Sequence, residues 1–257
     1  MKSPNVQQPS RNRVPASRWE PEVTIQQPFK NQILASLPAA EAARLFPHLR
    51  PQIFKRNQTL YDLRQRVETV YFLENGLCFI ATTMEDGGAV GVGIIGREGF
   101  VGATALLGGG NSPYRSFVQI AGSGYAIKAK TLAEQFQSGS SQLSLSLRRH
   151  LQAMIVQISQ TAVCNRVHEL EERLARWLLM CHDRVQLDDL PITHELLAMM
   201  LGTRRSSVTV AAGILQKAGL IRYSHGHVRI ENRKGLEKAA CECYSIVQDE
   251  YVRLGLL

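Results

Sequence analysis

The chain has 257 residues, which is enough for two domains that each bury a core. A composition with 44% hydrophobic and 20% charged residues excludes a disordered or fibrous protein. The formal net charge of +8 favours an anionic partner, and nucleic acid is the first candidate. No apolar run reaches the ~18 residues of a membrane span, and the N-terminus lacks the apolar core of a secretory signal. Five cysteines without a framework spacing predict reduced thiols and a cytoplasmic location.

The first half of the chain predicts a tail followed by a β-domain. Residues 1–30 are rich in Pro, Gln and Arg and predict a disordered arm. Apolar spacing over 31–49 indicates short helices. From Gln52 to about Ala126, short β-rich segments alternate with turn dipeptides such as Asn75-Gly76, Asp86-Gly87 and Gly109-Gly110. This pattern predicts an antiparallel β-roll within a domain of residues 31–140.

A long helix is predicted over residues 141–165. Its apolar residues recur in steps of four and three, which is the spacing of a seam between two helices. We expect this helix to dimerise through that seam, although the same face can pack on its own domain instead. The seam residues are Leu147, Leu151, Met154 and Ile158. A second helix is predicted from His168 to Arg184.

The segment from Thr193 to Ile230 has the spacing of a helix-turn-helix followed by a β-hairpin. With His194 as the first position, Ala198 is fifth, Gly202 ninth and Val208 fifteenth. Alanine allows the two helices to approach, glycine allows a turn with positive φ, and valine anchors the second helix. Thr193 and Thr203 are the expected N-caps.

The second helix of this segment has a face suited to DNA. At 100° per residue its outward side carries small residues near the N-terminus, where a recognition helix enters the major groove. Arg205 is the candidate for a bidentate contact to guanine, and Arg204 lies nearer the phosphates. The hairpin is expected to place its histidines on the DNA backbone as a wing. The predicted DNA-binding residues are Arg204, Arg205, Ser206, Thr209, Val210, Gly213, His225 and His227.

The order of a β-roll, a long helix and a winged helix-turn-helix resembles the Crp/Fnr superfamily of bacterial transcription regulators. The resemblance implies an α+β fold, with a dimerisation helix over 141–165 and a DNA-binding domain with an extra C-terminal helix over 166–257. Double-stranded DNA read as a pseudo-palindrome, a second copy of the chain and RNA polymerase are the implied partners, with no membrane. The alternative is an effector-binding module whose winged domain contacts protein instead of DNA.

The effector pocket departs from the family pattern. Gly102 and Arg115 match the family's glycine and phosphate-pairing arginine, but Ala103 replaces the ribose-binding glutamate. The positions of the adenine-reaching Thr-Ser pair hold Ile158 and Ser159. Each unmatched buried polar group costs ~1 to 3 kcal/mol, so cyclic AMP is not the expected effector. The pocket positions are Gly102, Ala103, Arg115, Ser116, Ile158 and Ser159.

Other cofactors and enzymatic activity are not expected. Residues 1–77 contain no cysteine for the N-terminal iron–sulfur cluster of Fnr-type members, and Cys78 reads as a core thiol, not a haem ligand. Cys241 and Cys243 read as packing residues on opposite sides of one helix, so no metal site is expected. An unknown small-molecule effector stays open. Neither a P-loop nor a nucleophile elbow occurs, so no catalytic residue is assigned.

This chain also differs from the family pattern on the recognition helix and in the segment after the wing. Many family members carry Arg-Glu and a further Arg on the recognition helix, where this chain has Arg205, Ser206 and Val210. We therefore do not expect the half-site TGTGA. After the wing, helical spacing from Leu236 to Leu254 predicts a helix that packs on the winged domain. A contact with RNA polymerase or another protein is its alternative role.

Overall fold

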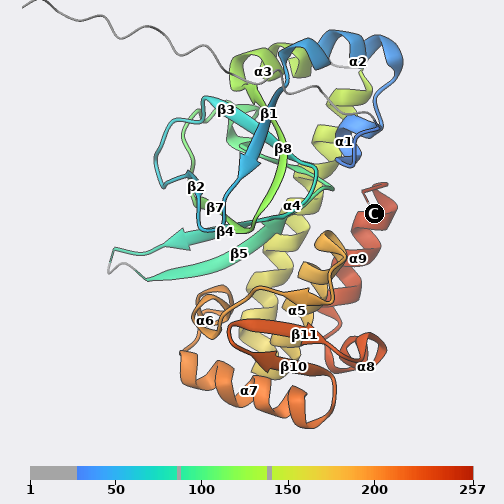
Figure 1. Ribbon diagram of the computed structural model, residues 1–257. Coiled ribbons are helices and arrows are strands. Elements are labelled where there is room, and N and C mark those ends of the chain that lie inside the picture. The colour runs from blue at the N-terminus through green and yellow to red at the C-terminus, as the bar shows by residue number, and fades with distance from the viewer. Residues whose placement is uncertain (1–27, 86–87, 138–140, 257) are drawn as a thin grey trace, which may run out of the picture.

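The computed structural model describes residues 28–85, 88–137 and 141–256 (Figure 1). Its upper half is the expected antiparallel β-roll, built from two four-stranded sheets of order β1-β8-β3-β6 and β2-β7-β4-β5. Alternating side chains of the two sheets fill the space between them. The strands are β1 (Arg50–Phe54), β2 (Thr59–Tyr61), β3 (Thr69–Leu73), β4 (Leu77–Thr83), β5 (Ala89–Ile95), β6 (Phe100–Val101), β7 (Arg115–Ile120) and β8 (Gly122–Lys128), with a short 3₁₀ turn η2 (Ala103–Ala105) after β6.

Short helices close one end of the β-roll, as expected. They are α1 (Gln32–Ala35), α2 (Ala39–Leu45), η1 (Phe46–His48) and α3 (Ala129–Gln137). The predicted tail ends too late, because Phe29 is buried with its ring centroid 4.6 Å from that of Phe46 and 5.1 Å from that of Tyr125. The domain core therefore includes Phe29. Residues 1–27 of the predicted tail lie outside the described residues.

The long helix α4 (Gln142–Val167) runs the length of the molecule (Figure 1). Ser141 caps its N-terminus by accepting a hydrogen bond from the Ser144 amide. Two of the four predicted seam residues are not open to a partner helix, because Leu147 and Met154 are buried in the cores of the β-roll. Leu151 is half-buried against the same domain. Ile158 is half-buried beside Gly93 of β5. The apolar spacing of a helix alone does not show whether its apolar face packs on a partner chain or on its own domain.

The lower half of the molecule is a winged helix-turn-helix domain. A three-stranded sheet of order β10-β11-β9 packs beside its helices. The elements are α5 (Leu170–Val185), β9 (Asp189–Leu190), α6 (His194–Leu201), α7 (Arg205–Lys217), β10 (Ile221–Ser224), β11 (His227–Ile230), α8 (Arg233–Ala239) and α9 (Cys243–Arg253). None of the helices in the described ranges combines the length and hydrophobicity needed to cross a membrane.

The β-roll touches the helix-turn-helix through the β4–β5 hairpin. A Cβ atom placed on Gly91 of β5 would lie 2.6 Å from the Met200 sulfur, so the close packing there requires glycine. Val90 packs in the same way beside Gly202, the residue that follows α6. The hairpin thus connects the β-roll to the turn that sets the angle of α7.

The C-terminal segment differs from the prediction in two respects: it forms two helices, and the second lies mainly along α4. The helical spacing from Leu236 to Leu254 is interrupted, because Ala240 is extended (ψ 149°) and separates α8 from α9. Helix α9 lies along α4, where Val247 and Tyr251 pack on Ala153 (Figure 1). The Tyr251 hydroxyl also accepts a hydrogen bond of 2.8 Å from the Gln157 side chain. Both helices also contact the winged domain: α8 packs on α5 through Leu236, and in α9 the Tyr244 hydroxyl donates a hydrogen bond of 3.0 Å to Asp183 of α5.

Candidate nucleic-acid interface

The turn of the helix-turn-helix forms as the spacing predicts. Thr193 caps α6 by accepting a hydrogen bond of 3.3 Å from the Leu196 amide. Gly202 ends the helix in the left-handed region with φ 59°, where a side chain is strained. Ala198 and Val208 are buried where the two helices meet. Thr203 is not a cap, because the N-cap position of α7 is held by Arg204 without a side-chain hydrogen bond.

Helix α7 has one buried face and one open face. Ser206, Thr209 and Val210 are exposed, and Val210 has 66% of its surface open to solvent. Nothing lies within 4 Å of a Cβ atom placed on Gly213. The opposite face is buried, as predicted, through Val208, Ala211, Ala212 and Leu215. The open face therefore consists of small side chains, which allow close approach to base edges.

The two arginines at the start of α7 have different surroundings. Arg205 points its guanidinium at Glu195 of α6, with Nε 2.8 Å from Oε1 and both side chains more than 60% exposed. Arg204 is exposed at the N-cap position. Glu195 was not among the predicted site residues, although an acid in the first turn of the preceding helix is a signal for such a pair. The carboxylate orients the Arg205 guanidinium at the end of the recognition helix.

The Thr209 hydroxyl faces the protein and not the solvent. It donates a hydrogen bond of 3.1 Å to the Arg205 carbonyl and lies 3.0 Å from His194 Nδ1. Burial, followed by the charge of Arg205, lowers the pKa of His194 and favours the neutral ring. That ring is stacked on Tyr223 of the wing at 3.8 Å between centroids. The predicted hydrogen bond from Thr209 to a base is therefore disfavoured, and its methyl group is the better candidate for a contact.

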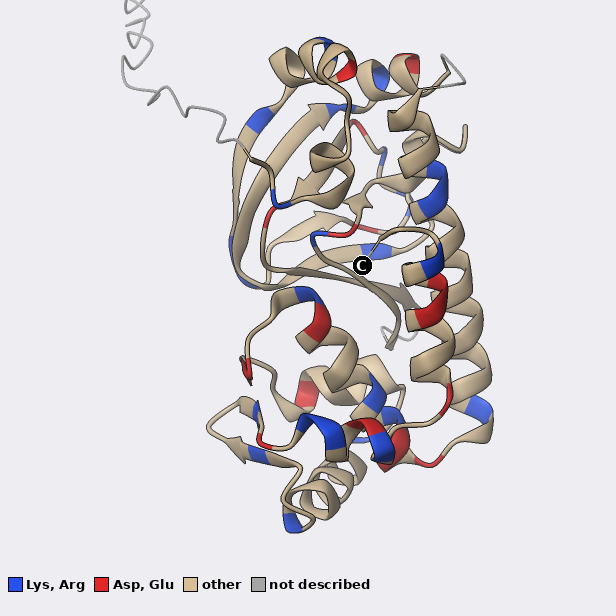
Figure 2. Ribbon diagram, turned by 90° about the vertical axis from the view of Figure 1, so that its right-hand side faces the viewer, with Lys and Arg blue, Asp and Glu red and all other residues tan. Residues whose placement is uncertain are grey.

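The wing turns at His225 and Gly226, both in the left-handed region with φ of 48° and 80°. His225 is exposed at the tip and hydrogen-bonded to Ser224, whereas Nδ1 of His227 is held 3.0 Å from Asp189 of β9. Lys and Arg residues occur on the helices and wing at the lower end of the molecule, with acidic residues among them (Figure 2). The exposed basic residues of this region include Arg204, Arg205, Lys217, Arg222, Arg229, Lys234 and Lys238.

Several basic residues of this region lie close to acidic side chains. Arg222 and Arg229 of the wing both lie near Glu231, at 3.1 and 3.8 Å. Arg233 of α8 forms an ion pair of 2.7 Å with Asp183 of α5, whose side chain is only 9% exposed. This contact makes Arg233 a packing residue between α8 and α5, in contrast to the other basic residues.

The predicted effector residues do not converge on one pocket. Arg115 lies on the outer face of the β-roll, 3.4 Å from Asp62, and lines a hollow of about 400 Å³ beside α6. The next residue, Ser116, points into the β-roll and its buried hydroxyl has no hydrogen-bond partner in the described residues. Gly102 precedes η2 with φ 109°, and Ala103 is buried in the core beneath the N-terminal helices. On α4, Ile158 is half-buried and Ser159 is exposed.

Three tyrosines contribute to the core of the β-roll. Tyr61, Tyr71 and Tyr114 line the same apolar core as Cys78, which is buried as predicted. Burial raises the pKa of all three hydroxyls, that of Tyr114 to about 12, so they stay neutral.

Comparison with known proteins identifies both halves of the chain. Residues 51–138 match the cyclic nucleotide-binding domain, and residues 172–239 match the Crp-like helix-turn-helix domain. The chain belongs to the Crp/Fnr family of transcription regulators. As a Crp/Fnr regulator it is a DNA-binding protein, and residues 172–239 form its Crp-like helix-turn-helix domain.

The chain is similar in sequence or structure to several named transcription regulators. The chain is 25% identical to the global nitrogen regulator of a Nostoc species over 75% of this chain and 89% of the relative. It is 25% identical to the transcriptional regulator SdrP of Thermus thermophilus, over 67% of this chain and 84% of the relative. The solved structure of FixK2 from Bradyrhizobium japonicum superposes with a TM-score of 0.65 at 16% identity, covering 75% of this chain and 98% of FixK2.

Proposed function

We propose that this Crp/Fnr regulator acts as a homodimer that reads a pseudo-palindromic DNA site, with half-sites about one helical turn apart. The open, small-residue face of α7, with Arg205 at its N-terminus, carries this proposal. The wing places exposed basic residues beside that face, where they can reach the phosphates. The half-site differs from TGTGA, because Ser206 and Val210 cannot make the contacts of a glutamate and an arginine.

Selection of binding sites from random duplexes at about 0.15 M salt tests the proposal. We expect the purified chain, without added ligand, to enrich a two-fold symmetric sequence. Its affinity for that sequence should fall steeply as the salt concentration rises, because bound counterions are released from the phosphates. Failure to enrich any sequence, together with salt-independent binding, would contradict DNA reading.

We also propose that cyclic AMP does not control this binding. Ala103 offers no acceptor for a ribose hydroxyl, and the Arg115 side chain lies on the outer face of the β-roll with Asp62 and Thr59 as its partners. Addition of millimolar cyclic AMP is expected to leave the Kd for the selected duplex unchanged, as measured by fluorescence anisotropy. An increase in affinity that is lost in Arg115→Ala would refute this independence.

A second copy of the chain is proposed to dock on the exposed side of α4. This side carries apolar residues that nothing in the described chain covers, in contrast to the seam expected from the sequence. The exposed apolar residues are Leu145, Ile155, Val163 and Val167, with exposed fractions of 43, 66, 50 and 62%. Exposed residues recur there in steps of three and four at 145, 148, 152, 155, 159 and 162, which suits pairing of two α4 helices.

Ile155→Arg is expected to convert the dimer to a monomer, because the new charge would be buried against the partner helix. Sedimentation velocity at micromolar concentration measures the change. Val210→Arg is the matched control, since Val210 is equally exposed on α7 and lies away from α4. A dimer that persists in Ile155→Arg would place the interface elsewhere.

A further inference from the structure

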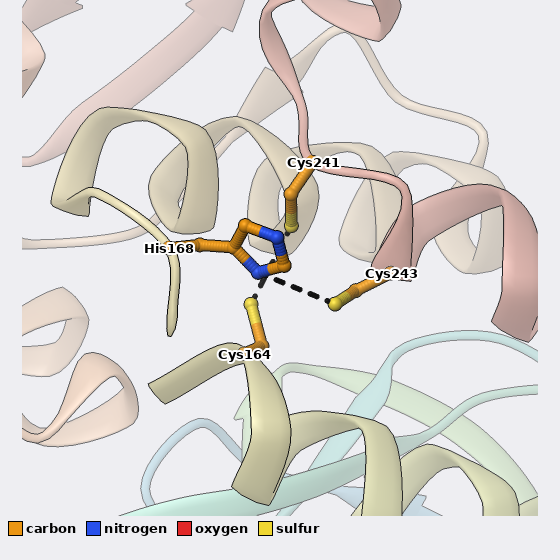
Figure 3. A group of neighbouring side chains, drawn as sticks. All are labelled: Cys164, His168, Cys241 and Cys243. Carbon is orange, nitrogen blue, oxygen red and sulfur yellow. Dashed lines mark hydrogen bonds between the residues drawn. The ribbon is translucent and has the colours of Figure 1, made fainter. Parts of the chain in front are cut away.

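Three cysteines and one histidine meet where the end of α4 lies beside the α8–α9 junction (Figure 3). Cys164 lies in the last turns of α4, and His168 is the residue that ends this helix. Cys241 and Cys243 come from the α8–α9 junction, more than 70 residues later in the chain. All four ligand atoms lie within 4.8 Å of one another.

The spacing of these atoms matches ligands that share one ion. The Cys164 and Cys241 sulfurs are 3.5 Å apart, and the Cys243 sulfur is 3.5 Å from His168 Nδ1. With zinc–sulfur bonds of ~2.3 Å and zinc–nitrogen bonds of ~2.0 Å, neighbouring ligands of a tetrahedral ion lie about 3.5 to 3.8 Å apart. The ligands of an iron–sulfur cluster bind different iron atoms and are spread more widely.

Neighbouring side chains form hydrogen bonds with His168 and Cys243 of the kind that orient metal ligands. The second ring nitrogen of His168, Nε2, is held 3.1 Å from the Glu242 carboxylate, which fixes the ring with Nδ1 toward the sulfurs. A carboxylate in this position is the common partner of a zinc-bound histidine. The Gln160 side-chain amide donates a hydrogen bond of 3.1 Å to the Cys243 sulfur and holds it in place.

The buried guanidinium of Arg176 beside the cluster would be stabilised by a negative charge nearby. Arg176 of α5 is fully buried and forms no ion pair with any carboxylate of the described residues. Its Nη2 donates to the Thr161 hydroxyl at 3.1 Å, and its Nε has no partner there. Three thiolates around one divalent ion leave a net negative charge near this guanidinium. An unpaired buried charge is costly, so such a complex would stabilise Arg176 in its position.

The remaining two cysteines behave as packing residues and provide a contrast. Cys78 and Cys181 are buried among apolar side chains, and burial raises the pKa of both thiols, that of Cys181 to about 12. In the cluster, by contrast, the Sγ atom of each cysteine lies within 4.8 Å of the other possible ligand atoms.

We propose that Cys164, His168, Cys241 and Cys243 bind one Zn²⁺ in a closed tetrahedral site. Three thiolates and one imidazole, with no position left for water, form a ligand set typical of structural zinc. The site fastens the start of α9 to the junction between α4 and α5, within the DNA-binding half of the molecule. This assignment replaces the expectation of no metal site and of two packing cysteines at 241 and 243. It is independent of the proposed reading of DNA.

Metal analysis of the full-length chain, purified under reducing conditions, tests the proposal. We expect one zinc per chain in the wild type and in the control Cys181→Ser, which removes a buried cysteine outside the cluster. Cys241→Ser and His168→Gln should lose at least nine tenths of the metal. Replacement of zinc by Co²⁺ should give thiolate charge-transfer bands and the intense visible bands of a tetrahedral ion, neither of which Cys241→Ser should show.

Stability provides a readout that does not involve DNA. Removal of the ion with excess chelator is expected to lower the midpoint of thermal unfolding of the wild type and of Cys181→Ser. The midpoint of Cys241→Ser should not respond to the chelator. A wild-type chain without metal after growth in zinc-supplemented medium would overturn the proposal. Iron with inorganic sulfide, or a mass lower by two hydrogen atoms from a Cys164–Cys241 disulfide, would overturn it equally.

Discussion

Replacement of Glu98 with Gln is expected to lower the free energy of unfolding by about 3–5 kcal/mol, because it leaves a buried arginine without its counter-charge. Glu98 lies between β5 and β6, and its Oε1 is 2.8 Å from Nε of Arg184 in α5. Both side chains are 1% exposed. The carboxylate also accepts the Gly96 amide at 3.0 and 3.1 Å. Glutamine keeps the shape and an acceptor oxygen, so the loss isolates the charge.

The Arg184 guanidinium has few other sources of compensation. It lies 5.0 Å from the centre of the Tyr251 ring of α9, and its Nη1 donates to the Met180 carbonyl at 3.0 Å. Burial acts to lower the pKa of Arg184, but the Glu98 carboxylate outweighs it, and the net pKa is raised. The pair therefore joins the β-roll, the DNA-binding domain and α9 through one charge interaction.

Urea denaturation followed by circular dichroism measures the effect. Arg222→Met is the matched control, because it removes an arginine from an exposed pair with Glu231 and should cost less than about 1 kcal/mol. Combining Glu98→Met with Arg184→Met should recover most of the loss, since an apolar pair leaves no unpaired charge. A cost for Glu98→Gln no larger than that of Arg222→Met would contradict this account.

The parts of the fold that depend on local stereochemistry were predictable from the sequence. Gly202 must adopt a positive φ in the turn, and Ala198 must be small where two helices meet, so their spacing alone locates the helix-turn-helix. Turn dipeptides such as Asn75-Gly76 in the same way separate the strands of the β-roll. These constraints act over a few residues and need no knowledge of the tertiary structure.

Features that depend on tertiary packing were missed or misassigned. The stripe of Leu147 and Met154 is buried by the β-roll, and only the structure shows that a second, exposed stripe containing Ile155 exists on the other side of α4. The helical spacing around Cys241 continues through Ala240, so the break between α8 and α9 is not visible in the pattern. The Cys164–His168 spacing at a helix end, together with Cys241-x-Cys243, was the available signal of a metal site.

The resemblance to a family motif likewise did not predict the direction of the Arg115 side chain. Its position in the family motif is matched, yet the strand presents Arg115 to the outer face and Ser116 to the interior. Successive residues of a strand face opposite sides, so a match to a motif does not determine which face of the sheet a residue occupies. The Glu98–Arg184 pair, 86 residues apart, could not be inferred from local patterns at all.

Arg205→Ala is expected to weaken binding to the selected duplex by ~1 to 3 kcal/mol per half-site, or about 5- to 150-fold, and to relax the preference at one base pair. Arg205 is the residue at the start of α7 whose guanidinium is held in place, 2.8 Å from Glu195. A base contact of this kind gains from such orientation, because less side-chain entropy is lost on binding. Titration of duplexes that vary one base pair at a time measures both the affinity and the preference.

Lys217→Ala provides the matched control for Arg205, because Lys217 is exposed at the far end of the same helix. As a phosphate contact, its loss should weaken all duplexes about equally and reduce the dependence of affinity on salt. The two variants therefore separate base reading from charge attraction on a single helix. If Arg205→Ala weakens matched and mismatched duplexes to the same extent, Arg205 contacts phosphate, and the sequence must be read by the small side chains of Ser206, Val210 and their neighbours.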